Sequence, residues 1–118
     1  MTVYVKDASK SVLSGLGKMK AAMIADYAKF MPPTKSDTTA KMNAEYVDKF
    51  DIRYGKKYIK VVCNSSVKAF VVGVDNDKKF KKGDILMAAS WAAPARNAAR
   101  GNILDGGYPI QWTGACYL

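Results

Sequence analysis

The chain has 118 residues, of which 49% are apolar, and a formal net charge of +9 at pH 7. This length and apolar fraction predict a single folded domain, residues 1–118, and exclude a disordered chain. No apolar run approaches the roughly 18 residues that a membrane span needs, and the segment MTVYVKDASK lacks the pattern of a signal peptide. We therefore expect a cytoplasmic protein that does not enter a membrane.

The missing residue types argue against catalysis. The chain has no histidine, which excludes histidine acid–base chemistry, triads with a histidine base and most zinc sites. The acidic residues are scattered, and the DND of residues 75–77 is followed by lysines rather than calcium ligands, so it predicts a turn. We predict that the protein is not an enzyme and needs no cofactor or metal, with lysine or cysteine chemistry left open.

The two cysteines, Cys63 and Cys116, do not form a CxxC pair. In a cytoplasm both are expected to be reduced, half-buried thiols. A disulfide between them is the alternative if their strands are neighbours.

The positive charge is concentrated in the second half of the chain. Residues 1–52 carry 8 basic and 6 acidic side chains, a net +2, whereas residues 53–118 carry 11 basic and 4 acidic ones, a net +7. The second half is therefore predicted to attract anions such as nucleic acid, a nucleotide or phosphate. The alternative is a solvated, lysine-rich surface that keeps the protein soluble.

Apolar residues at steps of three and four predict a long amphipathic helix over residues 8–31, capped by Asp7 or Ser9. Gly15 and Gly17 weaken its first turns, and the Pro32–Pro33 pair ends it. The helix is long for a domain of this size, so we expect part of its apolar stripe to pack against another subunit in a homo-oligomer. The alternative is that the stripe packs on the sheet of its own chain. The stripe consists of Val12, Leu13, Leu16, Met19, Met23, Ile24, Tyr27, Phe30 and Met31.

A shorter helix is predicted over residues 37–48, capped by Ser36 or Asp37. From Phe50 onward apolar residues alternate with period two, which predicts five short strands. The sequence thus predicts an α+β fold with two N-terminal helices followed by an antiparallel five-stranded meander or small barrel. Residues 1–50 would form a helical oligomerisation region and residues 51–118 a strand-rich ligand-binding region. The five strands are expected within residues 49–54, 56–63, 66–74, 84–90 and 108–118.

The connection over residues 90–108 is long for a compact domain, which favours a functional role. Its segment PARNAAR predicts a helical turn after Pro94 that places Arg96 and Arg100 on one face, where guanidinium groups can hold phosphate. Asn97 and Asn102 could read ribose or base edges.

Aromatic and hydroxyl groups complete this predicted ligand site. Trp91 could stack on a base, and Thr113, with the backbone N–H of Gly114, could bind phosphate. The alternative is structural: arginine and asparagine side chains often hold long loops by bonding to backbone carbonyls, and Trp91 and Trp112 would then belong to the core.

A second anion site is predicted at Arg53, Lys56 and Lys57, where three cations follow closely on one hairpin. The lysine run of residues 78–82 could also contact phosphates, although a solvated turn is the simpler interpretation.

Residues 80–118 resemble the C-terminal segments of small bacteriophage proteins, most closely at KGDIL, AASW, PARN, ARGNI and WTG. With helices first and strands second, the chain resembles the first-described Thoeris anti-defence family, phage sponges that sequester a cyclic ADP-ribose immune signal. The resemblance implies an oligomer in the cytoplasm of an infected bacterial host that binds a cyclic nucleotide without cleaving it, some relatives also holding cyclic oligonucleotides. It points to Phe80, Arg96, Asn97, Arg100 and Thr113 as the matching pocket residues.

Two other functions stay open. The basic second half with aromatic residues among its lysines is also typical of a nucleic-acid-binding module. The methionine-rich helix is also compatible with a protein that acts through a host or virion protein partner.

Overall fold

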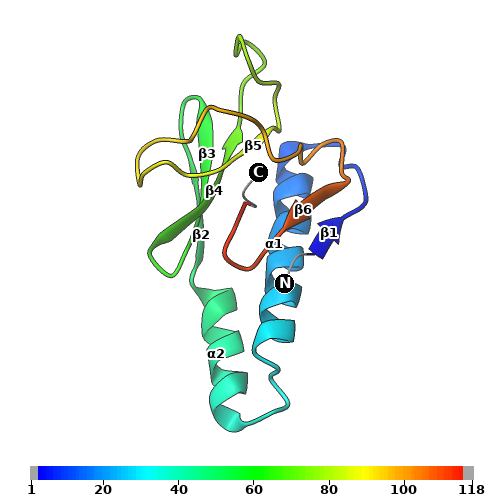
Figure 1. Ribbon diagram of the computed structural model, residues 1–118, viewed down its shortest axis with the longest axis vertical. Helices are drawn as coiled ribbons and strands as arrows, with labels where there is room; N and C mark the ends of the chain where they lie inside the picture. Colours follow the sequence, from blue (N-terminus) through cyan, green and yellow to red (C-terminus); the bar gives the residue numbers. More distant parts are fainter. Residues whose placement is uncertain (1–2, 116–118) are drawn as a thin grey trace.

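The computed structural model describes residues 3–115, and within them the chain forms six strands and two helices (Figure 1). A short strand precedes the helices, and five strands follow them. The elements are β1 (Val3–Val5), α1 (Val12–Phe30), α2 (Asp37–Asp48), β2 (Phe50–Tyr54), β3 (Tyr58–Cys63), β4 (Ser66–Val72), β5 (Ile85–Leu86) and β6 (Tyr108–Ile110).

Helix α1 begins four residues later than predicted. Its N-cap is Ser11, whose hydroxyl accepts the N–H of Ser14 at 3.2 Å. The residues before Ser11 do not continue the helix but bond to a distant segment: the N–H of Ser9 donates to the carbonyl of Leu104 at 2.9 Å. The helix ends at Phe30, before the predicted proline stop.

Helix α2 has the predicted bounds. Ser36 caps it: its hydroxyl accepts the N–H of Thr39 at 3.1 Å, and the Thr39 hydroxyl accepts the N–H of Ser36 at 3.1 Å. This reciprocal pair satisfies two of the free backbone donors at the start of the helix.

The main sheet is antiparallel, with the strand order β2-β3-β4-β5. A two-residue turn joins β3 to β4, and both of its residues, Asn64 and Ser65, have positive φ, at 53° and 62°. Such a turn matches the twist of the strands it joins. The sequence therefore located the hairpins correctly.

The predicted five-stranded meander or small barrel is wrong, although the α+β class is confirmed. The last predicted strand, β6, pairs with β1 in a separate two-stranded sheet, with Val3 opposite Ile110 and Val5 opposite Tyr108. No strand was predicted before the helices, so the sequence showed no partner for β6 other than the edge strand of the meander.

The edge of the main sheet is closed by the long connection instead. Strand β5 has two residues, and beyond it the chain turns back on itself: the N–H of Arg100 donates to Ile85 O at 2.7 Å, and the N–H of Ala95 donates to Met87 O at 2.7 Å. The connection thus supplies the hydrogen bonds that a fifth strand would have made.

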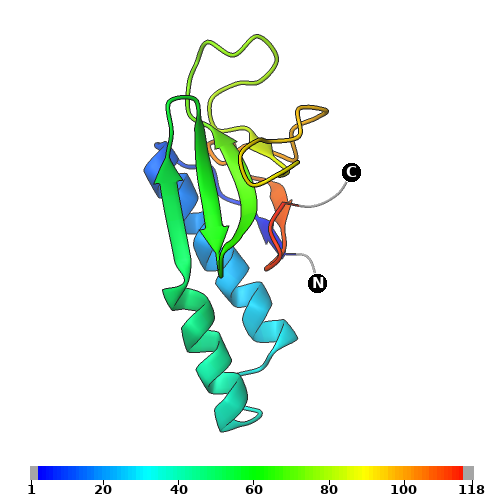
Figure 2. The same ribbon diagram turned by 90° about the vertical axis from the view of Figure 1, so that its left-hand side faces the viewer.

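Other parts of the chain lie on both faces of the sheet (Figure 2), and a core cluster packs against each face. On one face α1 and the β1–β6 pair cover it, and Leu16, Met19 and Met23 of α1 are buried. On the other face the connections after β4 and β5 cover a smaller cluster of Phe70, Val72, Phe80 and Leu86. The lower half of α1 extends beyond the sheet and packs with α2, which makes the molecule 48 Å long and 28 Å wide.

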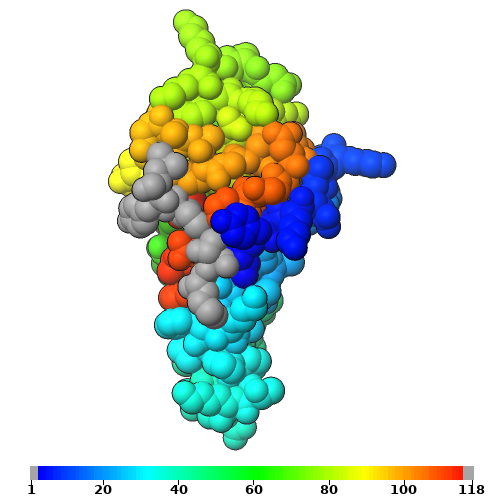
Figure 3. All heavy atoms as spheres, turned by 45° about the vertical axis from the view of Figure 1, so that its right-hand side comes forward, coloured from blue at the N-terminus to red at the C-terminus, as the bar shows by residue number. Residues whose placement is uncertain are grey.

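Gly15 lets another part of the chain lie directly on α1. A Cβ at this position would lie 2.9 Å from the carbonyl oxygen of Ile103 and 3.0 Å from its Cβ. The glycine that weakens the helix in isolation is therefore needed for tertiary packing. In Figure 3 the end of the long connection before β6 (orange) lies against the N-terminal region (blue).

The apolar stripe of α1 packs largely within its own chain. Its central residues are buried by the sheet and by β6, whereas Leu13 is 73% exposed and Phe30 is 52% exposed. A homo-oligomer through this helix stays a prediction.

Candidate anion-binding site

The guanidinium of Arg96 is bonded to other residues of the protein. Its guanidinium donates to both oxygens of Asp77, at 2.9 and 3.0 Å, and to the hydroxyl of Tyr58, and it lies 4.9 Å from the centre of the Phe80 ring. The Asp77 carboxylate also accepts the N–H groups of Lys79 and Phe80, at 2.8 and 2.9 Å. Arg96 thereby fastens the long connection to the turn of residues 75–77.

These contacts set the charge state of the pair. Hydrogen bonds from Arg96, then from the backbone of Lys79 and Phe80, and a bond from Lys57 hold the pKa of Asp77 far below its usual range. The bond to Asp77 raises the pKa of Arg96 further. One edge of the guanidinium thus already holds a carboxylate, which competes with any phosphate at that position.

The other predicted residues of the long connection also bond within the protein. Arg100 donates to Asn97 Oδ1 at 2.9 Å and to the carbonyl of Ala98 at 2.6 Å. Asn102 is buried, donates to Asp84 Oδ1 at 2.9 Å and accepts the N–H of Leu104 at 2.8 Å. The predicted helical turn after Pro94 does not form, because this segment runs beside β5 in an extended path.

The remaining predicted residues are spread over the molecule. Phe80 is buried in the smaller core, with 6% of its surface exposed. Thr113 is exposed after β6, and the N–H of Gly114 donates to Gln111 O at 2.8 Å within a tight turn. The lysine run is partly engaged as well, since Lys79 Nζ donates to the carbonyls of Arg96 and Asn97.

The second predicted anion site does come together. Arg53, Lys56 and Lys57 line one open hollow of about 310 Å³ on the β2–β3 hairpin. Lys60 adds a fourth cation, and Tyr54 is 63% exposed beside them. The ion pair of Arg53 with Asp51 at 2.7 Å is exposed on both sides, so a ligand anion can compete for this guanidinium. We call this surface the basic face; its residues are Arg53, Tyr54, Lys56, Lys57, Tyr58 and Lys60.

Trp91 extends the basic face. It is 47% exposed, and its ring lies 4.4 Å from Lys60 Nζ and 5.3 Å from Arg53 Cζ. A second hollow of about 350 Å³ lies next to the first, because Arg53 lines both, and Trp91 and Lys49 line the second. None of Trp91, Lys60 and Arg53 is buried, so the indole ring and the two charges beside it are available to a ligand.

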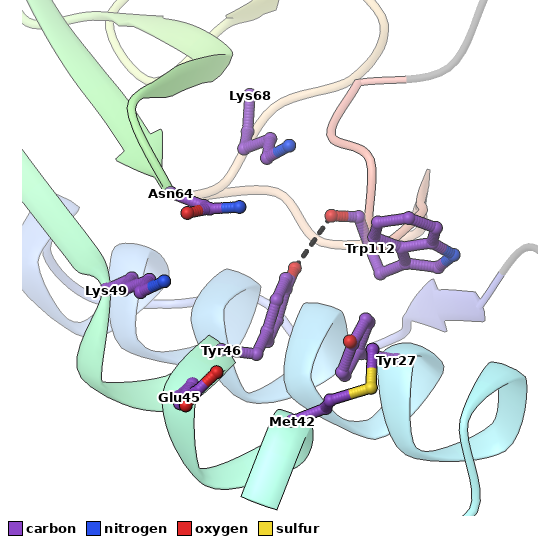
Figure 4. A pocket seen from close by; sticks show the side chains of 8 residues that line it. All are labelled: Tyr27, Met42, Glu45, Tyr46, Lys49, Asn64, Lys68 and Trp112. Carbon is purple, nitrogen blue, oxygen red and sulfur yellow. Dashed lines mark hydrogen bonds between the residues drawn. The ribbon is translucent and has the colours of Figure 1, made fainter. Parts of the chain in front are cut away.

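A more enclosed pocket lies between the helices and the β3–β4 turn (Figure 4). Its volume is about 170 Å³, and aromatic rings form much of its wall. No pattern in the sequence indicates this pocket, because Tyr27 reads as part of the apolar stripe of α1, Trp112 reads as core, and nothing in the sequence brings them together with Tyr46. We call it the aromatic pocket; it is lined by Tyr27, Met42, Glu45, Tyr46, Lys49, Asn64, Lys68 and Trp112.

Burial raises the pKa of Tyr46 well above its usual range, so its hydroxyl stays protonated and donates to the carbonyl of Trp112 at 2.7 Å. Beside it, burial raises the pKa of the free thiol of Cys63, while the ammonium groups of Lys68, Lys49 and Lys20 oppose that rise. Cys116, which would be its partner in the alternative of a disulfide, lies outside the described residues.

Within residues 3–115 no group of three or more potential Cys, Asp or Glu metal ligands comes together. No helix in the same range is long and apolar enough to cross a bilayer. No curated protein and no solved structure matches the chain. One family model matches residues 3–114, nearly the whole chain, and the protein therefore belongs to that family, a family of unknown function named DUF7717.

Proposed function

We propose that this protein binds a phosphate-bearing nucleotide on the basic face and holds it without chemical change. The observation that carries the proposal is the hollow that Arg53, Lys56 and Lys60 line together with the exposed ring of Tyr54. Lys57, the fourth cation of the hollow, is ion-paired with Asp77 at 3.0 Å. Guanidinium and ammonium groups bind phosphate oxygens, and an exposed ring can stack on a base. The hollow, at about 310 Å³, is at the lower end of the size range of small-ligand pockets.

The resemblance of residues 80–118 to the Thoeris anti-defence family makes a cyclic ADP-ribose isomer the first ligand to test. In that reading the protein is a phage sponge in the cytoplasm of an infected bacterial host. The hollow is open on one side, so a second copy of the chain would be needed to enclose the ligand. Because Arg96 and Asn102 bond within the protein, we expect the phosphate contacts on the basic face rather than on the long connection.

A single-stranded oligonucleotide is the second candidate. It is favoured by the continuity of the surface: Arg53 joins the two hollows, and Trp91 lies beside them between Lys60 and Arg53. Cations that follow a groove and rings that stack on bases are the features of nonspecific single-strand binding.

The test combines native mass spectrometry with titrations of fluorescently labelled oligonucleotide. The variant is Arg53→Gln with Lys56→Gln, and the matched control is Lys10→Gln with Lys41→Gln, which removes the same charge from exposed sites elsewhere. We expect the wild type and the control to bind one of the two ligands with its mass unchanged, and the variant to bind at least about tenfold more weakly, the effect of losing about 1.4 kcal/mol.

The two ligand classes separate in the same experiment. Oligonucleotide affinity should fall steeply as the salt concentration is raised. A bound cyclic nucleotide should instead increase the mass of the protein by the mass of a whole number of intact ligand molecules. Equal affinity of the variant and the control for every ligand would rule out the basic face as the site. Absence of any bound nucleotide at low salt would rule out the function.

A further inference from the structure

We propose that the aromatic pocket, which shares only Lys49 and Asn64 with the hollow beside Trp91, is a second binding site for a small planar organic anion: one aromatic ring that carries a carboxylate or a phosphate. The proposal does not depend on the nucleotide function of the basic face. It is based on three properties of the pocket: rigid aromatic walls, cations that have no ion-pair partner among residues 3–115, and a small volume.

The walls are held in place by the protein itself. The rings of Tyr27 and Tyr46 stack with 4.3 Å between their centres and 6° between their planes, and Trp112 meets Tyr27 edge-on at 5.2 Å. The Tyr46 hydroxyl donates to the backbone carbonyl of Trp112, and the backbone N–H of Trp112 donates to Asp26 Oδ2 at 2.9 Å. These bonds join α1, α2 and the segment after β6, so the pocket needs no ligand to form.

The polar side of the pocket is positively charged. Lys49 follows α2, Asn64 is in the β3–β4 turn, and Lys68 is in β4; in Figure 4 Asn64 lies between the two lysines along the side of the pocket that faces the sheet. Neither lysine has an ion-pair partner among residues 3–115. Two ammonium groups and an amide beside a flat apolar wall are the groups that recognise an anion attached to a ring.

The size and the opposite side restrict the ligand further. About 170 Å³ is below the usual range for drug-sized ligands, which excludes a dinucleotide and favours a single ring. Met42 and Glu45 line the side away from the sheet, and the thioether of Met42 can adapt to the shape of a ring. The Glu45 carboxylate disfavours a ligand that presents its anionic group to that side, which orients the anion toward Lys49 and Lys68.

The experiment uses Trp112 as the reporter. The chain has two tryptophans, so a Trp91→Phe background leaves Trp112 as the only fluorescent indole. Benzoate and phenyl phosphate are titrated separately to distinguish carboxylate from phosphate, with benzyl alcohol as the neutral analogue. Lys49→Gln with Lys68→Gln is the test variant, and Lys41→Gln, an exposed α2 position outside the pocket, is the control.

We expect saturable fluorescence changes with at least one anion, and at least about tenfold weaker binding both for benzyl alcohol and for the test variant, with the control unchanged. Far-UV circular dichroism of each variant confirms that it is folded. Adding Arg53→Gln with Lys56→Gln should leave the affinity unchanged, which separates this site from the basic face.

Three results would overturn the proposal. They are the absence of a saturable change with either anion in the folded protein, equal affinity for benzyl alcohol, and loss of affinity in the Arg53 and Lys56 variant rather than in the Lys49 and Lys68 variant. The last result would place the ring on the basic face.

Discussion

The guanidinium of Arg96 holds the carboxylate of Asp77 through two hydrogen bonds, with both donor nitrogens within 3.0 Å of an oxygen. The Asp77 side chain is completely shielded from solvent, whereas that of Arg96 is 37% exposed. The pair joins the turn after β4 to the connection after β5. An arginine that the sequence presents as a ligand contact thus has a partner nineteen positions away in the chain.

Asp77→Asn is expected to lower the melting temperature by several degrees, because Arg96 and Lys57 lose their anionic partner. The folded-state pKa of Asp77 is depressed, so its stabilisation is present above the unfolded pKa of about 3.9 and is lost as pH falls below it. The difference in melting temperature between wild type and variant should therefore shrink below about pH 4. A constant difference from pH 7 to acidic pH would contradict this assignment.

Gly15→Ala and Gly17→Ala should have opposite effects, although both replace a glycine in the same helix. A Cβ at position 15 would lie 2.9 Å from Ile103 O, whereas nothing lies within 4 Å of a Cβ at position 17. Gly17→Ala should stabilise the protein by up to about 1 kcal/mol through helix propensity. Gly15→Ala should destabilise it in urea titrations; equal stabilisation by both changes would show that Ile103 moves without cost.

Tyr108→Phe is expected to leave stability at neutral pH unchanged or slightly higher. The Tyr108 hydroxyl is buried and has no hydrogen-bond partner among residues 3–115, and removing an unsatisfied group can be neutral or favourable. Burial raises the pKa of Tyr108 to about 12. Since the folded-state pKa is raised, the stability of the wild type should decrease as pH rises above the unfolded value of about 10. The variant should not show the part of this decrease that is due to Tyr108.

Measurement of urea midpoints at pH 7 and at alkaline pH checks this prediction. Tyr54→Phe is the control, because Tyr54 is exposed and not packed in the core. A loss of several kcal/mol in Tyr108→Phe at pH 7 would mean that the hydroxyl has a partner after all.

Asp26 tests how the segment after β6 is held. Its side chain is buried, Oδ2 accepts the Trp112 N–H at 2.9 Å, and Oδ1 has no partner within the described range. Asp26→Ala removes the acceptor and should cost about 1–3 kcal/mol. Asp26→Asn keeps an acceptor oxygen and should cost clearly less in the same unfolding assay. Equal losses would show that charge, rather than this hydrogen bond, is what matters.

The sequence predicted well what depends on local pattern. The bounds of α2 follow from the Ser36 cap, and β2, β3 and β4 follow from period-two alternation and the NSS turn. The basic face was also predictable, since Arg53, Lys56 and Lys57 are neighbours in sequence and remain neighbours on a hairpin.

What depends on distant pairing was not predictable. The segment of three residues that forms β1 has a partner only after the rest of the chain is in place, and the role of Arg96 depends on Asp77. The aromatic pocket brings together α1, α2, β4 and Trp112, and each of its rings reads as ordinary core within its own element.

The pairing of β1 with β6 has a consequence for protein synthesis. Val5 and Tyr108, which face each other across this pair, pack in the same core as Leu16 of α1. A ribosome makes β6 long after α1, so the apolar face of the helix lacks part of its cover until Ile110 has emerged. During this interval the nascent chain exposes methionine and leucine side chains to chaperones and to neighbouring chains.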